Sequence, residues 1–188
     1  VVPFEIKKAD SNVTITTKSL DKTYDGNKVN DPTYETSGSD GKVSIKYQEY
    51  KADKWVDLSS APTNVGKYKV VVTLDGNDNF NSASKELEFT ISKTTVNTWA
   101  EAVASWAEKL SIKGWKYGET ANTPTAKAKF GSVTYTYSDK ENGTYTSDVP
   151  SNAGTYYVKA TVTETENYTG LESVVPFEIL KADPVLKA

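Results

Sequence analysis

The sequence predicts an all-β protein made of two tandem antiparallel β-sandwich modules, with a short helical insertion at their junction. Hydrophobic residues make up 37% of the chain, and 12 tyrosines with frequent Thr and Val suit half-buried strands. Apolar and polar residues alternate in several runs, which turn-forming residues separate at short intervals. A length of 188 residues allows one large domain or two small ones, and an internal repeat favours two.

The repeat is a P-x-N-x-G-x-Y motif at residues 62–68 that returns at residues 150–156. Each copy is followed by an Asn-aromatic pair and by a closing F-x-I-x-K run, which starts at Phe89 and at Phe177. Recurrence of the same signals in the same order indicates two related structural units. We therefore expect module 1 to span residues 13–93 and module 2 to span residues 111–183.

A second repeat joins the two ends of the sequence. Residues 1–10 and 174–183 agree at nine of ten positions, with Leu180 in place of Lys7. We expect residues 1–12 to be the terminal strand of a preceding repeat or a lead-in strand of module 1, and residues 184–188 to be a tail. The chain is then a piece of a longer array, and an unpartnered strand at Val1–Ile6 could also pair with another molecule.

The strands follow from runs in which one face is apolar and the other carries Lys, Thr or Glu. An antiparallel sheet with one solvated face has this pattern, and two such sheets bury each other in a sandwich. In chain order the runs cover residues 13–16, 43–47, 68–74, 87–91, 133–137, 156–162 and 175–179.

Residues 97–110 break the alternation. Their apolar positions follow the spacing of one stripe of an amphipathic helix, and Thr98 with Glu101 forms a capping pair. The stripe consists of Trp99, Val103, Trp106 and Leu110. We predict a helix in a linker that spans residues 94–110, where it would fill the junction between the modules or set its angle.

Tyr24-Asp25-Gly26, the P-x-N-x-G-x-Y motif and the closing F-x-I-x-K run together resemble the YDG/MBG-type repeats of bacterial surface proteins. The resemblance implies immunoglobulin-like modules, strung on the bacterial cell surface between a signal peptide and an anchor. Module 2 departs from it, with Tyr117-Gly118-Glu119 in place of Tyr-Asp-Gly. The implied function is that of non-catalytic spacers whose partners are neighbouring repeats of the same chain.

The tyrosines of the repeats are expected to be structural. Gly66 and Gly154 permit a tight turn, and a tyrosine follows two residues later in each copy. Tyr68 and Tyr156 would place their rings in the core and return their hydroxyls to the loop backbone, as in a tyrosine corner. The structural set is Tyr24, Gly66, Tyr68, Tyr117, Gly154 and Tyr156; ligand contact at these tyrosines is the weaker alternative.

The composition argues against enzymes and against several kinds of partner. Cys, His, Met and Arg are absent, which excludes disulfides, thiol nucleophiles, Ser-His-Asp triads, histidine-ligated metals and arginine clamps. The net charge of -3 gives no attraction to nucleic acid, and no apolar run is long enough for membrane insertion. We expect no catalytic residue and no cofactor.

The sequence gives weak indications of two ligand sites, one for calcium and one for a glycan or protein. Asp75, Asn77, Asn79 and Glu86 partly follow the spacing of a calcium loop, although a polar hairpin turn explains them better. Trp55 lies in a polar region and is the tryptophan that we expect to be most exposed. The alternative function is therefore an adhesin or carbohydrate-binding module that contacts a host glycan or matrix protein through Trp55 or the junction.

Two structural alternatives stay open. Many Lys and Asn in a chain without Cys permit an intramolecular Lys–Asn isopeptide cross-link, although no specific trio of residues indicates one. A ubiquitin-like β-grasp fold would also serve a stalk. Module 1 weighs against that fold because it shows no helix between its strands.

Overall fold

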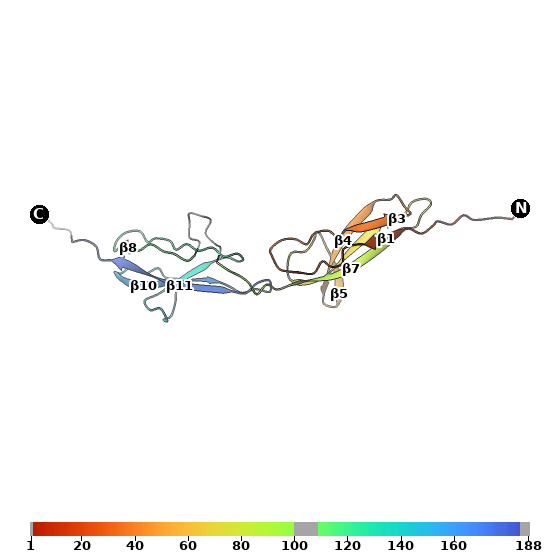
Figure 1. The fold of residues 1–188 in the computed structure, drawn as a ribbon. Coiled ribbons are helices and arrows are strands. Elements are labelled where there is room, and N and C mark those ends of the chain that lie inside the picture. Colours follow the sequence, from red (N-terminus) through yellow and green to blue (C-terminus); the bar gives the residue numbers. More distant parts are fainter. Residues whose placement is uncertain (1, 100–108, 185–188) are drawn as a thin grey trace. The chain divides into compact units, whose positions relative to one another are not determined.

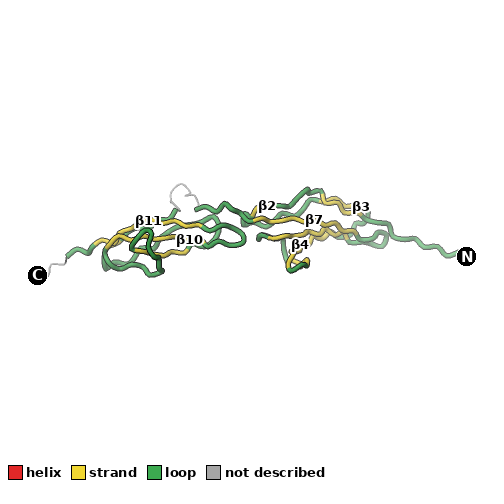
Figure 2. Tube along the Cα trace, turned by 90° about the horizontal axis from the view of Figure 1, so that it is seen from below, coloured by secondary structure: helices red, strands yellow, loops and turns green. Residues whose placement is uncertain are grey.

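The computed structural model describes residues 2–99 and 109–184, which divide between two compact units, Val1–Thr94 and Thr95–Ala188. The described residues form eleven strands and no helix (Figures 1 and 2). The predicted all-β class is thus confirmed for this part of the chain. With no helix present there, the described residues offer no apolar helix that could cross a membrane.

Unit 1 contains a five-stranded sheet in the order β2-β7-β6-β4-β5. Its neighbouring strands are antiparallel except for β2 and β7, which run parallel. The strands are β2 (Lys22–Thr23), β4 (Val43–Lys51), β5 (Lys54–Leu58), β6 (Gly66–Leu74) and β7 (Ala83–Ser92). Strand β6 shows the alternation that the sequence predicts, because Tyr68, Val70, Val72 and Leu74 are all buried on one face.

A small second sheet covers part of that buried face. Strands β1 (Asn12–Ile15) and β3 (Tyr34–Ser37) pair antiparallel, and Val13 of β1 packs with Val72 and Leu74 of β6. Further along the sheet, β7 contributes Phe89 to a cluster that includes Val29, Tyr47, Tyr68, Val70 and Ile91. The core of unit 1 therefore lies between the long sheet and the chain that crosses over it.

Unit 2 contains a four-stranded sheet in the order β8-β11-β10-β9. The strands are β8 (Trp115–Lys116), β9 (Thr134–Ser138), β10 (Gly154–Val162) and β11 (Leu171–Leu180). Strand β11 pairs antiparallel with β10 and parallel with β8, which repeats the arrangement of β7 between β6 and β2. Its core gathers Leu110, Trp115, Tyr137, Val158, Ala160, Phe177 and Ile179.

The predicted helix at residues 97–110 is not supported by the described residues. Residues 100–108 lie outside them, and no residue of the described flanks, 97–99 and 109–110, is helical. Trp99 forms an antiparallel bridge with Ala128, and Ser111 forms one with Thr125. These two bridges stand where β1 pairs with β3 in unit 1.

The first and last residues of the predicted helical stripe, Trp99 and Leu110, are apolar because they pack in the core of unit 2. Leu110 is buried in the core of unit 2, and Trp99 packs against the same core. The Asn97 amide also donates to the carbonyl oxygens of Phe130, at 3.2 Å, and Thr169, at 3.0 Å. Both described flanks therefore belong to unit 2, where Trp99 is bridged to Ala128 and Leu110 directly precedes the bridged Ser111.

Candidate functional site

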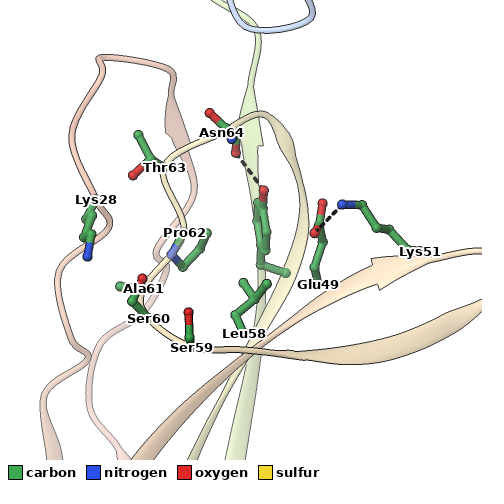
Figure 3. Close-up of a pocket in the computed structure, with 11 residues that line it drawn as sticks. Lys28, Glu49, Lys51, Leu58, Ser59, Ser60, Ala61, Pro62, Thr63 and Asn64 are labelled. Carbon is green, nitrogen blue, oxygen red and sulfur yellow. Dashed lines mark hydrogen bonds and ion pairs between the residues drawn. The ribbon is translucent and has the colours of Figure 1, made fainter.

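The P-x-N-x-G-x-Y turn of unit 1 lines a hollow of about 270 Å³ between the turn and strand β4 (Figure 3). The Tyr68 hydroxyl donates a hydrogen bond of 2.9 Å to the carbonyl oxygen of Asn64. On the strand side, the Lys51 ammonium lies 2.8 Å from the Glu49 carboxylate. The hollow is thus walled by turn residues, by one ion pair and by a tyrosine ring.

Tyr68 is buried, and its hydroxyl is hydrogen-bonded to the turn rather than to solvent. Its side chain is only 2% exposed, and burial raises the pKa of its hydroxyl. A Cβ at Gly66 would come within 2.9 Å of the Tyr68 ring, so a larger residue there would displace a ring that has no free space. The geometry is that of a tyrosine corner, with the hydroxyl returned to the loop backbone.

The same turn in unit 2 is looser. Tyr156 is half-buried, and a Cβ at Gly154 would lie 3.5 Å from its ring, which is an ordinary contact. No bond equivalent to that of Tyr68 joins Tyr156 to Asn152 among the described residues. A hollow of about 230 Å³ lies beside Tyr156, Tyr137 and Pro150. The two units therefore share the turn but not its hydrogen bond.

Tyr24 and Tyr117 have equivalent backbones and different surroundings. The N–H of Tyr24 donates to the Ser92 carbonyl at 2.8 Å, and the N–H of Tyr117 donates to the Leu180 carbonyl at 2.8 Å. Tyr24 packs against the core of unit 1, whereas Tyr117 is 53% exposed. In unit 2, Trp115 supplies the buried ring instead.

Trp55 lies on the outer face of the five-stranded sheet. It stands opposite Tyr50 across the β4–β5 hairpin, and the two ring centroids are 5.1 Å apart. The Lys69 ammonium lies 4.6 Å from the Trp55 centroid, and that of Lys67 lies 5.3 Å from the Tyr50 centroid. Trp55 is therefore half-buried under lysine side chains, less exposed than the sequence suggests.

Two carboxylates complete this outer-face patch, which consists of Tyr50, Trp55, Lys67, Lys69, Glu86 and Glu88. Glu88 lies 2.8 Å from Lys67, and its hydrogen bond raises the pKa of that ammonium. Glu86 lies 2.9 Å from Lys69. Aromatic faces beside paired charges can stack on a sugar ring and bind its hydroxyls, provided that Lys69 moves off the indole.

Sequence reasoning singled out Trp55 but missed the rest of the patch. The available signal was the spacing of two residues between Lys67 and Lys69 and between Glu86 and Glu88, which puts each pair on one face of its strand. Only the register Lys67↔Thr90 and Lys69↔Glu88 brings the two pairs together across the sheet.

The four residues of the calcium hypothesis do not converge. The Asn77 side-chain oxygen accepts from the backbone N–H groups of Asn79, at 2.9 Å, and Phe80, at 2.8 Å, which caps the turn between β6 and β7. The carbonyl of Asp75 accepts from the Ser39 hydroxyl, and Glu86 pairs with lysine on the outer face. Within the described residues, no cluster of three or more acidic side chains could hold a metal ion.

Comparison with known proteins identifies the repeated unit. A family model described as the MBG domain matches residues 13–95 and residues 114–183. The two matches together cover most of the chain, and the second begins after the inserted residues. No curated protein matches the chain.

Solved structures show only distant similarity. One, described as the structural basis for Dscam isoform specificity, is 10% identical with a TM-score of 0.31, over 97% of this chain and 48% of that chain. A second, of Drosophila N-cadherin EC1-4, is 12% identical with a TM-score of 0.33, over 94% of this chain and 50% of that chain. The chain thus spans about half the length of these two structures.

Proposed function

Because the chain belongs to the MBG domain family, we propose that its two modules are non-catalytic structural repeats that act as spacers in a secreted bacterial surface protein. In this role each module is a stiff unit, neighbouring repeats of the same chain are its partners, and a binding region elsewhere is displayed away from the cell. The array works by repetition of units with their own cores, as in other repeat proteins.

The shortness of the connection between the units is the observation that carries this proposal. Strand β7 ends at Ser92, and the carbonyl of Thr95 already accepts a hydrogen bond from the Thr169 hydroxyl of unit 2, at 3.2 Å. Only Lys93 and Thr94 lie between these two points. Two residues span at most about 7 Å, which limits how far apart the two ends of this connection can lie.

The first residues of unit 2 are fixed to its core by hydrogen bonds of the Asn97 side chain. Asn97 is 8% exposed, and its side chain both donates to the Phe130 carbonyl, at 3.2 Å, and accepts from the Phe130 N–H, at 3.1 Å. Buried side-chain hydrogen bonds of this kind fix the backbone that carries them. The chain is therefore anchored on both sides of Lys93 and Thr94, as a stiff spacer requires.

Distance measurements between the units test the spacer. The chain has no Cys, so spin labels attach only at introduced cysteines. Glu35→Cys in β3 and Glu172→Cys in β11 are exposed positions, one in each unit. We expect a narrow distance distribution by pulsed electron paramagnetic resonance. In a matched control, a Gly-Gly-Ser insertion between Lys93 and Thr94 should broaden it; a native distribution as broad as the control's would refute the spacer.

The outer-face patch favours a second candidate function, recognition of a host glycan or matrix protein. Its supporting observation is the Tyr50–Trp55 ring pair beside two lysines at a sheet edge. We expect Trp55→Ala to abolish saturable binding in a glycan and matrix-protein screen. Val56→Ala is the matched control, since Val56 is 49% exposed on the same strand but points to the opposite face. Binding that is equal for both variants would contradict this function.

A further inference from the structure

Residues 2–6 carry the sequence of a core strand but lie in solvent. Val2, Phe4 and Ile6 are each 87% exposed, and among the described residues this segment joins no sheet. The same residues in β11 are core: Phe177 is 6% exposed and Ile179 is 1% exposed. Exposed apolar residues in such a row mark an interaction site.

The single difference between the two copies supports the same conclusion. Lys7 corresponds to Leu180, and Leu180 is 47% exposed. The two buried positions of β11, Phe177 and Ile179, are therefore unchanged in the N-terminal copy, where they are Phe4 and Ile6. The proline fits as well, since Pro176 faces Tyr157 on one side and precedes the pairing with β8, which begins at Ile179.

The chain after this segment is fixed to unit 1. The Ala9 N–H donates to the Asn79 carbonyl, and the Asn81 N–H donates to the Ala9 carbonyl, both at 2.8 Å. Both modules of the chain already have a closing strand, β7 in unit 1 and β11 in unit 2. Neither module therefore offers residues 2–6 a vacant place.

We propose that residues 2–6 are the closing strand of a third MBG module, one whose sheet is open along the strand equivalent to β10. The register of β11 defines the fit: Phe4 lies opposite the equivalent of Tyr156, Glu5 opposite that of Thr155 and Ile6 opposite that of Gly154. Antiparallel pairing satisfies the exposed backbone, and Phe4 and Ile6 enter the core of the receiving module.

The test weakens the packing of β11 in unit 2 of the full chain, so that the position beside β10 becomes available to another strand. Phe177→Ser with Ile179→Ser removes the two buried side chains of β11 and leaves its length unchanged. Glu5→Cys with Thr155→Cys then places one thiol on the donor segment and one on the receiving strand, at positions that pair as Glu178 and Thr155 do. The protein has no other thiol.

We expect this quadruple variant to form disulfide-linked head-to-tail chains on oxidation, with amide exchange protection of β10 restored as they form. Glu5→Cys with Thr155→Cys in an otherwise native chain should stay reduced, because β11 already pairs with β10. Adding Phe4→Ser with Ile6→Ser should abolish the linked chains, while Lys7→Leu should leave them unchanged.

Two results would overturn the proposal: free thiols with unprotected β10 amides in the quadruple variant, or linked chains that persist when Phe4 and Ile6 are replaced. The readout is independent of the spacer function, which depends on the distance distribution between the units of the native chain. A failure of one proposal therefore leaves the other standing.

Discussion

The two units share a central three-strand arrangement and differ in how they fill it. In both, a long closing strand pairs antiparallel with its neighbour and parallel with a two-residue strand, and Phe89 or Phe177 lies at the centre of the core. Lys22 and Trp115 occupy the same position on that short strand, opposite Ile91 and Ile179. The comparison shows that the same backbone position can hold a lysine or a tryptophan, provided that another aromatic ring fills the core where the lysine does not.

The compensation is visible in the aromatic contacts. Trp115 stacks on Phe177 with ring centroids 5.2 Å apart, and Tyr117 is left exposed. In unit 1, Tyr68 stacks on Phe89 at 5.6 Å, and Tyr24 packs against the same core. The equivalent positions Tyr68 and Tyr156 both contact the central Phe, at 5.6 Å and 5.9 Å, but only unit 2 adds a tryptophan stacked on it. The two tyrosines that begin the modules, Tyr24 and Tyr117, therefore differ in burial.

Replacement of the residue on the short strand should separate the units most strongly. We expect Trp115→Ala to lower the free energy of unfolding of unit 2 by about 3–5 kcal/mol, because a large buried ring is lost. Lys22→Ala should cost unit 1 less than about 1 kcal/mol, since it removes a partly exposed ion pair with Asp25. Denaturant-dependent amide exchange in β6 and β10 reports the units separately. Equal losses would show that the two positions are not distinguished by burial.

The turn glycines should give the next largest difference. Gly66→Ala places a methyl group against the buried Tyr68 ring, and we expect a loss of about 1–3 kcal/mol in unit 1. Gly154→Ala meets Tyr156 at an ordinary contact distance and should change unit 2 by less than about 1 kcal/mol. The same exchange measurement applies. A cost at Gly154 as large as that at Gly66 would contradict the tighter turn of unit 1.

Removal of the tyrosine hydroxyls tests the corner itself. Tyr68→Phe loses the bond to the Asn64 carbonyl and should destabilise unit 1 by about 0.5–1.5 kcal/mol. Tyr156→Phe should leave unit 2 nearly unchanged. Thermal unfolding followed by calorimetry measures both, with each variant compared with the parent chain. A neutral Tyr68→Phe would mean that water replaces the hydroxyl without cost.

Acid should destabilise unit 1 through a group that unit 2 lacks. Asp21 accepts from the Ser19 hydroxyl and from the Thr90 N–H, and these bonds lower its pKa. The stabilisation is present above the unfolded pKa of about 3.9 and is lost as the pH falls through the lower folded value. Asp21→Asn should flatten that dependence in β6 amide exchange. Unit 2 has Gly114 at the matching place, and its acid response should be unchanged by the substitution.

Local pattern was enough to predict most of the strands but little of the candidate site. The alternation in residues 68–74 and 156–162 appears directly as the buried faces of β6 and β10, because the side chains of a strand alternate between its two faces. The family resemblance, carried by the same residues, is confirmed by the match to the MBG domain. The outer-face patch depends on strand register between β4, β5, β6 and β7, which no local pattern encodes.

The helix prediction failed in its described part for a related reason. Trp99 and Leu110 fit a helical stripe, yet both pack in the unit 2 core from non-helical positions, Trp99 at a bridge with Ala128 and Leu110 beside the bridged Ser111. Spacing along the chain cannot distinguish one helix from two strand ends that approach the same core.

The sequence by itself determined the all-β class, the two repeats and the near-identity of residues 1–10 with residues 174–183, because these depend on residue type and period alone. The tertiary structure decided which copy of that strand is buried, which tyrosines enter a core and which lysines cover Trp55. These outcomes depend on partners that lie far away in sequence, and burial follows from the available space between packed elements rather than from any residue's own preference.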